Sequence, residues 1–67
     1  MDSLKIGDLL FDQEHLGMVI AVRTDHYLDS FYDIEWYLRG EPQLHTRMPH
    51  YNAIKYRQIY LDYHEQK

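Results

Sequence analysis

The stretch "SFYDIEWYLRGE", residues 30–41, alternates polar and apolar side chains and strongly limits what the chain can fold into. Successive side chains of a β-strand point to opposite faces of a sheet, so the pattern predicts a strand with one face in a core. Ile34, Trp36 and Leu38 are expected to face that core. The residues between them are expected to face outward: Asp33, Glu35, Tyr37 and Arg39.

A second interpretation places Trp36 in a surface cage for a cationic ligand, as Tudor-type domains do for methylated Lys or Arg. Such a cage would draw its other groups from neighbouring rings and acids: Tyr27, Tyr32, Tyr37, Asp33 and Glu35. Trp36 is expected on the same face of the strand as the apolar residues Ile34 and Leu38, so the sequence favours a core position for Trp36.

Three further stretches predict strands. "LKIGDLLFD" begins with Leu4 and Ile6 on one parity and is interrupted at Gly7, which indicates a bend. The polar loop that follows ends at Gly17, which can take positive φ. "MVIAVR", residues 18–23, is almost continuously apolar and predicts a strand buried on both faces.

The fourth strand follows a turn at residues 40–42, where Gly and Pro break the pattern. "QLHTRM", residues 43–48, alternates again, with Leu44, Thr46 and Met48 on one side. Pro49 is expected to end this strand or to mark an edge of the sheet.

The C-terminal segment has neither Gly nor Pro after Pro49, and its residues Ala53, Tyr56, Tyr60 and Tyr63 recur at helical spacing. This spacing predicts a helix over residues 50–65, with Asn52 as a possible cap. A competing interpretation is a tight turn followed by a fifth strand, "QIYLDY", because Ile, Leu and Tyr also suit strands.

Length and composition predict one small domain over residues 1–67. Hydrophobic residues make up 45% of the chain and aromatic residues 15%, which is enough for a small core. The chain has no cysteine, so disulfides and zinc–thiolate sites are excluded and a reducing compartment is favoured. The acidic start and the lack of a long apolar run argue against a signal peptide or a membrane-spanning helix, so we expect a cytoplasmic protein.

The formal charge of −4 is unevenly distributed. Residues 1–36 contain eight acidic and two basic side chains, whereas residues 37–67 contain five basic and three acidic ones. Proteins that follow the phosphates of a nucleic acid need a basic stripe, so this balance argues against nucleic acid as the partner.

With the strands placed, the chain resembles SH3-like small β-barrels, and its pattern is most similar to small proteins of tailed bacteriophages. The residues that carry the resemblance fall in three groups: Gly7, Asp8, Leu9 and Leu10; Gly17, Val19, Ile20 and Val22; and Ile34, Trp36 and Gly40. It covers about residues 4–48, and the tyrosine-rich tail departs from it. The resemblance implies a mainly β fold in which four to five short antiparallel strands form a small barrel. We expect the C-terminal helix in addition to this barrel. It also implies a virion or host-interaction protein, located in the host cytoplasm or the virion.

No arrangement of residues predicts catalysis, a cofactor or a metal site. The chain has no nucleophile elbow, phosphate loop or dinucleotide fingerprint. Its histidines are scattered, without the spacing of metal ligands: His15, His26, His45, His50 and His64. The acidic pairs, Asp12 with Glu14 and Asp33 with Glu35, are expected on solvated surface. We therefore predict that the protein is not an enzyme.

The tyrosines of the tail predict a protein–protein interface, because Tyr and Arg are common anchors of such surfaces. The candidate residues are Tyr37, Tyr51, Tyr56, Arg57, Tyr60 and Tyr63. The alternative is that one helix face packs on the sheet and the hydroxyls point outward. The predicted function is a non-enzymatic interaction module, phage-encoded, that docks on a larger phage or host protein or on itself. Two alternatives stay open: a nucleic-acid or transcription accessory domain, and an acidic inhibitor that uses residues 1–36.

Overall fold

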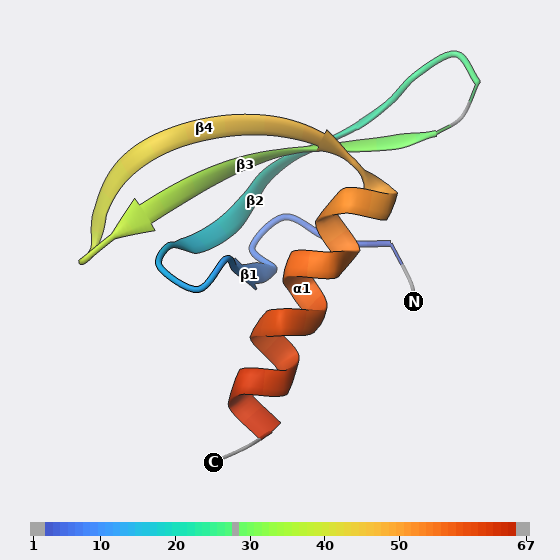
Figure 1. Ribbon diagram of the computed structural model, residues 1–67. Coiled ribbons are helices and arrows are strands. Elements are labelled where there is room, and N and C mark those ends of the chain that lie inside the picture. Colours follow the sequence, from blue (N-terminus) through green and yellow to red (C-terminus); the bar gives the residue numbers. More distant parts are fainter. Residues whose placement is uncertain (1–2, 28, 66–67) are drawn as a thin grey trace.

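The computed structural model describes residues 3–27 and 29–65, which form four strands followed by one helix (Figure 1). The elements are β1 (Leu9–Phe11), β2 (Leu16–Thr24), β3 (Ser30–Leu38), β4 (Glu41–Pro49) and α1 (His50–Glu65). The strands form one antiparallel sheet in the order β1-β2-β3-β4. The predicted mainly β class and C-terminal helix are confirmed. The sheet is open, with β1 and β4 at its edges, so an SH3-like barrel is not confirmed.

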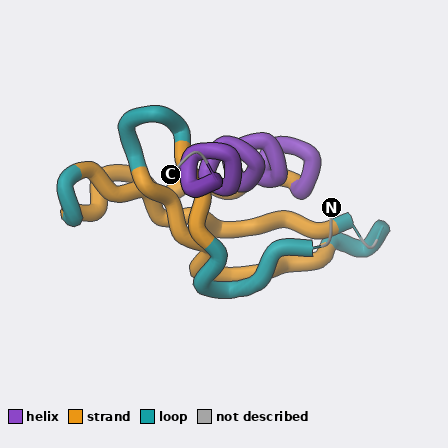
Figure 2. The backbone as a smooth tube through the Cα atoms, turned by 90° about the horizontal axis from the view of Figure 1, so that it is seen from below, coloured by secondary structure: helices purple, strands orange, loops and turns teal. Residues whose placement is uncertain are grey.

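The sheet is strongly curved, and α1 lies on its concave side (Figure 1). Two register shifts occur: Ile20 of β2 has no partner on β3, and Gln43 of β4 has no partner opposite Trp36 and Tyr37 of β3. Such bulges bend a strand and increase its twist, which accounts for part of the curvature. Viewed from below, the single helix lies beside the strands, which are joined by short loops (Figure 2). One face of the sheet is therefore covered and the other is not.

The core lies between the concave face of the sheet and α1. Its members are Leu4, Leu10, Val19, Tyr32, Ile34, Trp36 and Ala53, with Met48 and Tyr56 packed against them. Trp36 is 4% exposed, its Nε1–H donates to Thr46 Oγ1 at 2.8 Å, and the Tyr56 ring packs edge-on at 5.4 Å. The core interpretation of Trp36 is thus confirmed, and the surface cage is wrong.

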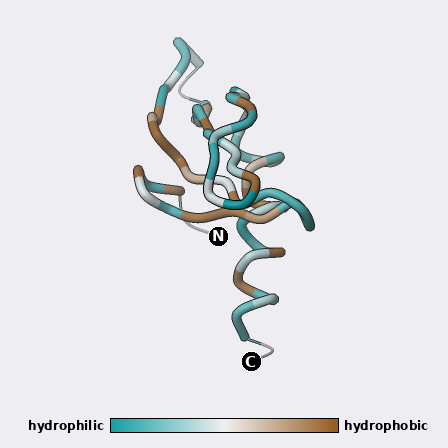
Figure 3. Tube along the Cα trace, turned by 90° about the vertical axis from the view of Figure 1, so that its left-hand side faces the viewer, coloured by the Kyte–Doolittle hydropathy of each residue, from teal (hydrophilic) through white to brown (hydrophobic). Residues whose placement is uncertain are grey.

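Helix α1 begins directly after Pro49, which ends β4 as predicted. The competing fifth strand is wrong, because "QIYLDY" is helical. The suggested cap is also wrong, since Asn52 lies inside the first turn of the helix. Ala53 is fully buried, and its small side chain lets the helix approach the sheet closely. Hydrophobic residues gather in the strands and appear as separate spots along the helix (Figure 3).

Strand β2 is not buried on both faces, contrary to the prediction for residues 18–23. Val19 is fully buried, but Ile20 and Val22 are 36% and 43% exposed. Ile20 is the unpaired residue of the bulge, and Val22 pairs with Tyr32 on the helix side of the sheet but lies toward the end of the strand, where it stays exposed. The continuous apolar sequence of residues 18–23 therefore does not correspond to a strand that is buried on both faces.

Of the two glycines interpreted from the sequence, Gly7 has the predicted role and Gly17 does not. Gly7 does adopt a bend, with φ of 96°, in a turn where Asp8 N–H donates to Lys5 O at 3.0 Å. This turn separates buried Leu4 from exposed Ile6, so their expected shared face is wrong. Gly17 does not take positive φ; it lies within β2, opposite Trp36. The ring of Trp36 occupies the space that a side chain at position 17 would need.

Leu38, which was expected in the core, lies near its margin instead, and so does Leu44. Leu38 is at the end of β3 and Leu44 is on the edge strand β4, and both are exposed. The helix runs from the end of β4 past β1, away from the turn that joins β3 to β4 (Figure 1). Arg39 and Gly40, both at positive φ, form the turn between these strands. The turn was predicted at residues 40–42, so it begins one residue earlier than expected.

Candidate functional site

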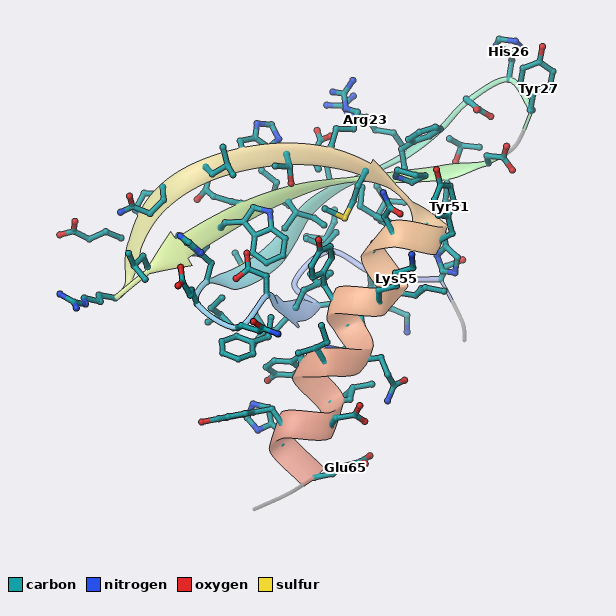
Figure 4. The ribbon with its side chains drawn as sticks, viewed as in Figure 1. Arg23, His26, Tyr27, Tyr51, Lys55 and Glu65 are labelled. Atoms are coloured by element: carbon teal, nitrogen blue, oxygen red, sulfur yellow. The ribbon has the colours of Figure 1, made fainter. Side chains whose placement is uncertain are left out.

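The face of the sheet opposite α1 carries the candidate site, and we call it the outer face. Cross-strand register places the following residues on it: Leu16, Met18, Ala21, Arg23, Phe31, Asp33, Glu35, Tyr37, His45 and Arg47. Arg23 points away from the helix (Figure 4). An antiparallel sheet with one uncovered face is usually polar on that face. Here, three aromatic or thioether side chains are mixed with two arginines and two acids.

Asp33 is the centre of an ion cluster on the outer face. Its Oδ2 accepts from Arg23 Nε at 2.9 Å and its Oδ1 accepts from Arg47 Nε at 2.8 Å. His45 Nε2 lies 3.9 Å from Oδ2. The residue is 3% exposed, because these neighbouring side chains cover it. The expectation that Asp33 lies on a solvated face is therefore wrong: it points outward, but it is buried beneath arginines.

The two arginines change the acidity of Asp33. Its pKa is lowered from 3.8 to about 2, chiefly by the hydrogen bond from Arg47; burial opposes this shift, and Arg23 reinforces it. The same contact raises the pKa of Arg47. Asp33 is consequently ionised throughout the range in which proteins normally function.

This shift predicts an acid-dependent loss of stability. A carboxyl with a depressed pKa in the folded state stabilises the fold above its unfolded pKa, near 3.8, and loses that contribution as the pH falls through about 2. We expect the free energy of unfolding of the native protein to exceed that of Asp33→Asn at neutral pH. The difference should shrink between these two pH values. Urea unfolding at a series of pH values measures it; a difference that stays constant with pH would contradict the assignment.

The arginines use only their Nε atoms on Asp33. Among the residues that the structure describes, no acceptor takes a hydrogen bond from the terminal amino groups of Arg23 or Arg47. Both side chains are more than half exposed. They line an open hollow of about 310 Å³ together with Thr24, Asp25 and Phe31. Asp33 thus holds two guanidinium groups in fixed positions with donors still available.

A second hollow adjoins the first through Phe31. It has a volume of about 400 Å³ and lies where the β2–β3 hairpin meets the start of α1. Its lining residues are Asp29, Ser30, Phe31, Pro49, His50 and Tyr51. We call the two hollows together the Phe31 site. One end of the site holds two arginines and Asp25, the middle is aromatic, and the other end combines the Pro49 and Tyr51 side chains with polar groups.

His50 is held in place at the second hollow. Leu4 N–H donates to Tyr32 Oη at 3.1 Å, and Tyr32 Oη lies 2.9 Å from His50 Nδ1. The Tyr32 hydroxyl thus accepts from Leu4 and also forms a hydrogen bond with the His50 ring. The ring at the start of α1 is therefore tied to the core and to the N-terminal segment.

Elsewhere on the outer face, Tyr37 is paired with an acid. Its hydroxyl donates to Glu35 Oε1, and this hydrogen bond to a carboxylate raises the pKa of Tyr37. Tyr37 is half-buried, and its cross-strand neighbour is Leu16. It is the one predicted interface residue that lies on the outer face.

Two of the predicted interface residues on α1, Tyr56 and Arg57, contact the sheet, whereas Tyr60 is half-buried and contacts Arg57 and His64 of the same helix. Tyr56 packs on Trp36. Arg57 Nη1 donates to Leu9 O at 2.8 Å, and its guanidinium lies 5.4 Å from the centre of the Tyr60 ring. The contacts of Tyr56 and Arg57 dock the helix on β3 and on β1, respectively. The sequence left open that the tail tyrosines belong to a helix face that packs on the sheet. For this part of α1, that interpretation agrees with the structure.

The remaining two tyrosines of the predicted interface are exposed and lie far apart along α1. Tyr51 is 65% exposed near the start of the helix, where it lines the Phe31 site. Tyr63 is 54% exposed near the other end, with its ring 5.4 Å from that of Phe11. The structure therefore does not gather the six predicted residues into one patch.

Sequence reasoning missed the three residues that define the Phe31 site. Arg23, Phe31 and Arg47 were not candidates, although a signal for them existed. Phe31 and Asp33 lie on the same face of β3, and the pairing of β4 with β3 places Arg47 opposite Asp33 on that face. The cluster becomes visible only when the register is known, because its members come from three strands.

Over residues 3–27 and 29–65, no three His, Asp or Glu side chains gather closely enough to hold a metal ion. No helix in the same residues is both long and apolar enough to cross a membrane. Comparison of the chain with models of protein families, with curated proteins and with solved structures finds no match.

Proposed function

We propose that the protein is a non-enzymatic binding module that docks on a larger protein through the outer face of its sheet. The observation that carries this proposal is the Phe31 site, where an aromatic side chain and two arginines lie on a face that no element of the described chain covers. A fold with a single sheet and a single helix needs only one sheet face for its core. The composition of the other face is then free to serve binding.

The chemical character of the outer face supports a protein partner. Met, Tyr, Phe and Arg are enriched in protein interfaces, and Met18, Phe31 and Tyr37 are all half-buried on the outer face, Phe31 next to the arginines. Leu16 adds an exposed aliphatic side chain. Because Asp33 already holds Arg23 and Arg47, binding would cost less side-chain entropy than it does for freely moving arginines.

The proposal differs in place from the interface expected on the C-terminal tail. Tyr37 lies on the outer face and Tyr51 lines the Phe31 site, whereas Tyr56 and Arg57 dock the helix. As part of the proposal we keep the resemblance to SH3-like proteins of tailed bacteriophages, which implies a virion component or a host protein as the partner. A nucleic acid remains a less favoured ligand, since the chain carries a charge of −4.

Affinity capture with matched variants tests the proposal. Phe31→Ala and Tyr63→Ala each remove one ring, the first from the outer face and the second from the far end of α1. From extracts of cells that naturally contain the chain, the native protein and Tyr63→Ala should retain the same partner protein. Phe31→Ala should lose it, while its circular dichroism spectrum stays native.

Two results would contradict the proposal. One is loss of the partner with Tyr63→Ala but not with Phe31→Ala, which would return the interface to the tail. The other is retention of nucleic acid in place of protein, with binding that weakens steeply as salt rises.

A further inference from the structure

We infer that the Phe31 site takes an acidic side chain of the partner at its arginine end, so that the partner segment carries an Asp or Glu close to an apolar residue. The inference rests on the proposed function and specifies the chemistry of its ligand. It names the side-chain carboxylate as the group that Arg23 and Arg47 bind.

The available donors are the first reason. Each guanidinium donates one hydrogen bond, from Nε, to a carboxylate oxygen of Asp33, with N–O distances of 2.8–2.9 Å. The terminal amino groups on both side chains form no hydrogen bond within the described chain, and they line the same hollow. Carboxylates match the planar fork of a guanidinium well, and charge-assisted hydrogen bonds of this kind are the strong ones.

The distribution of acids in the site sets the position of the ligand carboxylate. Asp29 lines the second hollow, which therefore disfavours an anion. Asp25 lines the arginine end, but its Oδ1 accepts from the N–H groups of Tyr27 and Asp29 at 2.9 and 3.0 Å. The carboxylate is thus expected between the two arginines, away from Asp25.

The aromatic middle of the site supplies the second half of the recognition. Phe31 lines both hollows, so one ligand can contact the arginines and the ring at once. Beyond Phe31, the apolar surfaces of Pro49 and Tyr51 suit an apolar side chain. In an extended peptide, residues two apart point to the same side and lie about 7 Å apart. A segment of the form acid–any–aromatic therefore fits the polarity of the site.

Peptide titration followed by NMR tests this inference on the intact protein. The probes are acetyl-Asp-Gly-Phe-amide, its uncharged isostere acetyl-Asn-Gly-Phe-amide, and inorganic phosphate. The Nε–H signals of the four arginines report separately on the cluster, on Arg39 in a turn, and on Arg57 at Leu9 O. We expect the Asp peptide to shift the signals of Arg23 and Arg47 saturably, with affinity about tenfold or more above that of the Asn peptide. The other two arginines should not respond.

Two variants sharpen the test. Thr24 is exposed at the rim of the arginine end, so Thr24→Glu places a competing carboxylate there without disturbing the core. This variant should lose most of the affinity for the Asp peptide. Arg39→Gln removes an arginine outside the site and should leave the affinity unchanged.

Three outcomes would overturn the inference. They are equal affinity for the Asp and Asn peptides, equal shifts at Arg39, and shifts that phosphate reproduces at the same concentration. If the two peptides bind alike while Phe31→Ala still loses the captured partner, the docking surface stands and only the carboxylate position is wrong. If the Asp peptide binds as expected but Phe31→Ala retains the partner, the anion site stands and the proposed function is wrong.

Discussion

Replacing Trp36 with alanine should lower the free energy of unfolding by about 3–5 kcal/mol, the usual cost of truncating a buried Trp. A domain of this size typically has a total stability on the order of 3–10 kcal/mol, so much of the protein should be unfolded. The indole is 4% exposed, contacts Tyr56 on the helix, and donates to Thr46 on β4. Its loss therefore weakens the packing of both α1 and the edge strand.

Urea unfolding followed by far-ultraviolet circular dichroism measures this effect, because the variant has no other tryptophan to report by fluorescence. Trp36→Phe keeps an aromatic ring but loses the hydrogen bond to Thr46, and it should be affected less. Tyr27→Ala, which removes a highly exposed ring, is the matched control and should be nearly neutral. If Trp36→Ala were as stable as Tyr27→Ala, the indole would not be at the centre of the core.

Replacing Gly17 with valine should be comparably damaging. A Cβ at this position would lie 2.8 Å from Cε3 and Cζ3 of the Trp36 ring and 3.1 Å from Cγ2 of Ile34. The ring cannot move aside easily, because Thr46 and Tyr56 hold its position. Overpacking of a core costs about 1–3 kcal/mol, and we expect alanine at position 17 to fall in this range and valine to exceed it.

Thermal unfolding of Gly17→Ala and Gly17→Val measures the series. Gly40→Asn is the matched glycine control, because a Cβ there meets no atom within 4 Å and Asn tolerates the positive φ of 83°. The control should keep a melting temperature near that of the native protein. An unchanged melting temperature for Gly17→Val would show that β2 does not approach the Trp36 ring so closely.

Local patterns in the sequence predicted the secondary structure well. Alternation in residues 30–41 identified β3 and put Trp36 inside, and the helical spacing of Ala53 and Tyr56 identified α1. These signals work because one element meets one core, so the apolar residues repeat with the period of that element. The bend at Gly7 and the end of β4 at Pro49 followed from backbone constraints on those two residue types.

Properties that depend on neighbouring strands could not be predicted in the same way. The apolar run at 18–23 could not show that only one face of β2 is covered. Whether a helix lies on a given face of a strand depends on other segments of the chain. Gly17 was interpreted from its conformational freedom, but its position reflects the missing side chain opposite Trp36. Asp33 was expected in solvent, because the arginines that cover it lie 10 and 14 residues away on other strands.

The candidate site was predicted least well for the same reason. Tyrosines on one helix are easy to find in a sequence, yet Tyr56 docks that helix on Trp36 and Tyr60 contacts Arg57 of the same helix. The Phe31 site draws residues from β2, β3, β4 and the start of α1, so its members are not adjacent in the sequence. Only the register of the sheet brings them together.

Site-specific photo-crosslinking tests the location of the binding surface most directly. A photoreactive phenylalanine is introduced at Thr24, on the rim of the Phe31 site, or at Gln58, an exposed residue of α1. On illumination in cells that naturally contain the chain, the Thr24 position should form one discrete adduct with a larger protein, and Gln58 should form none. An adduct at Gln58 with none at Thr24 would contradict the account, because the partner would then contact the helix and leave the outer face free.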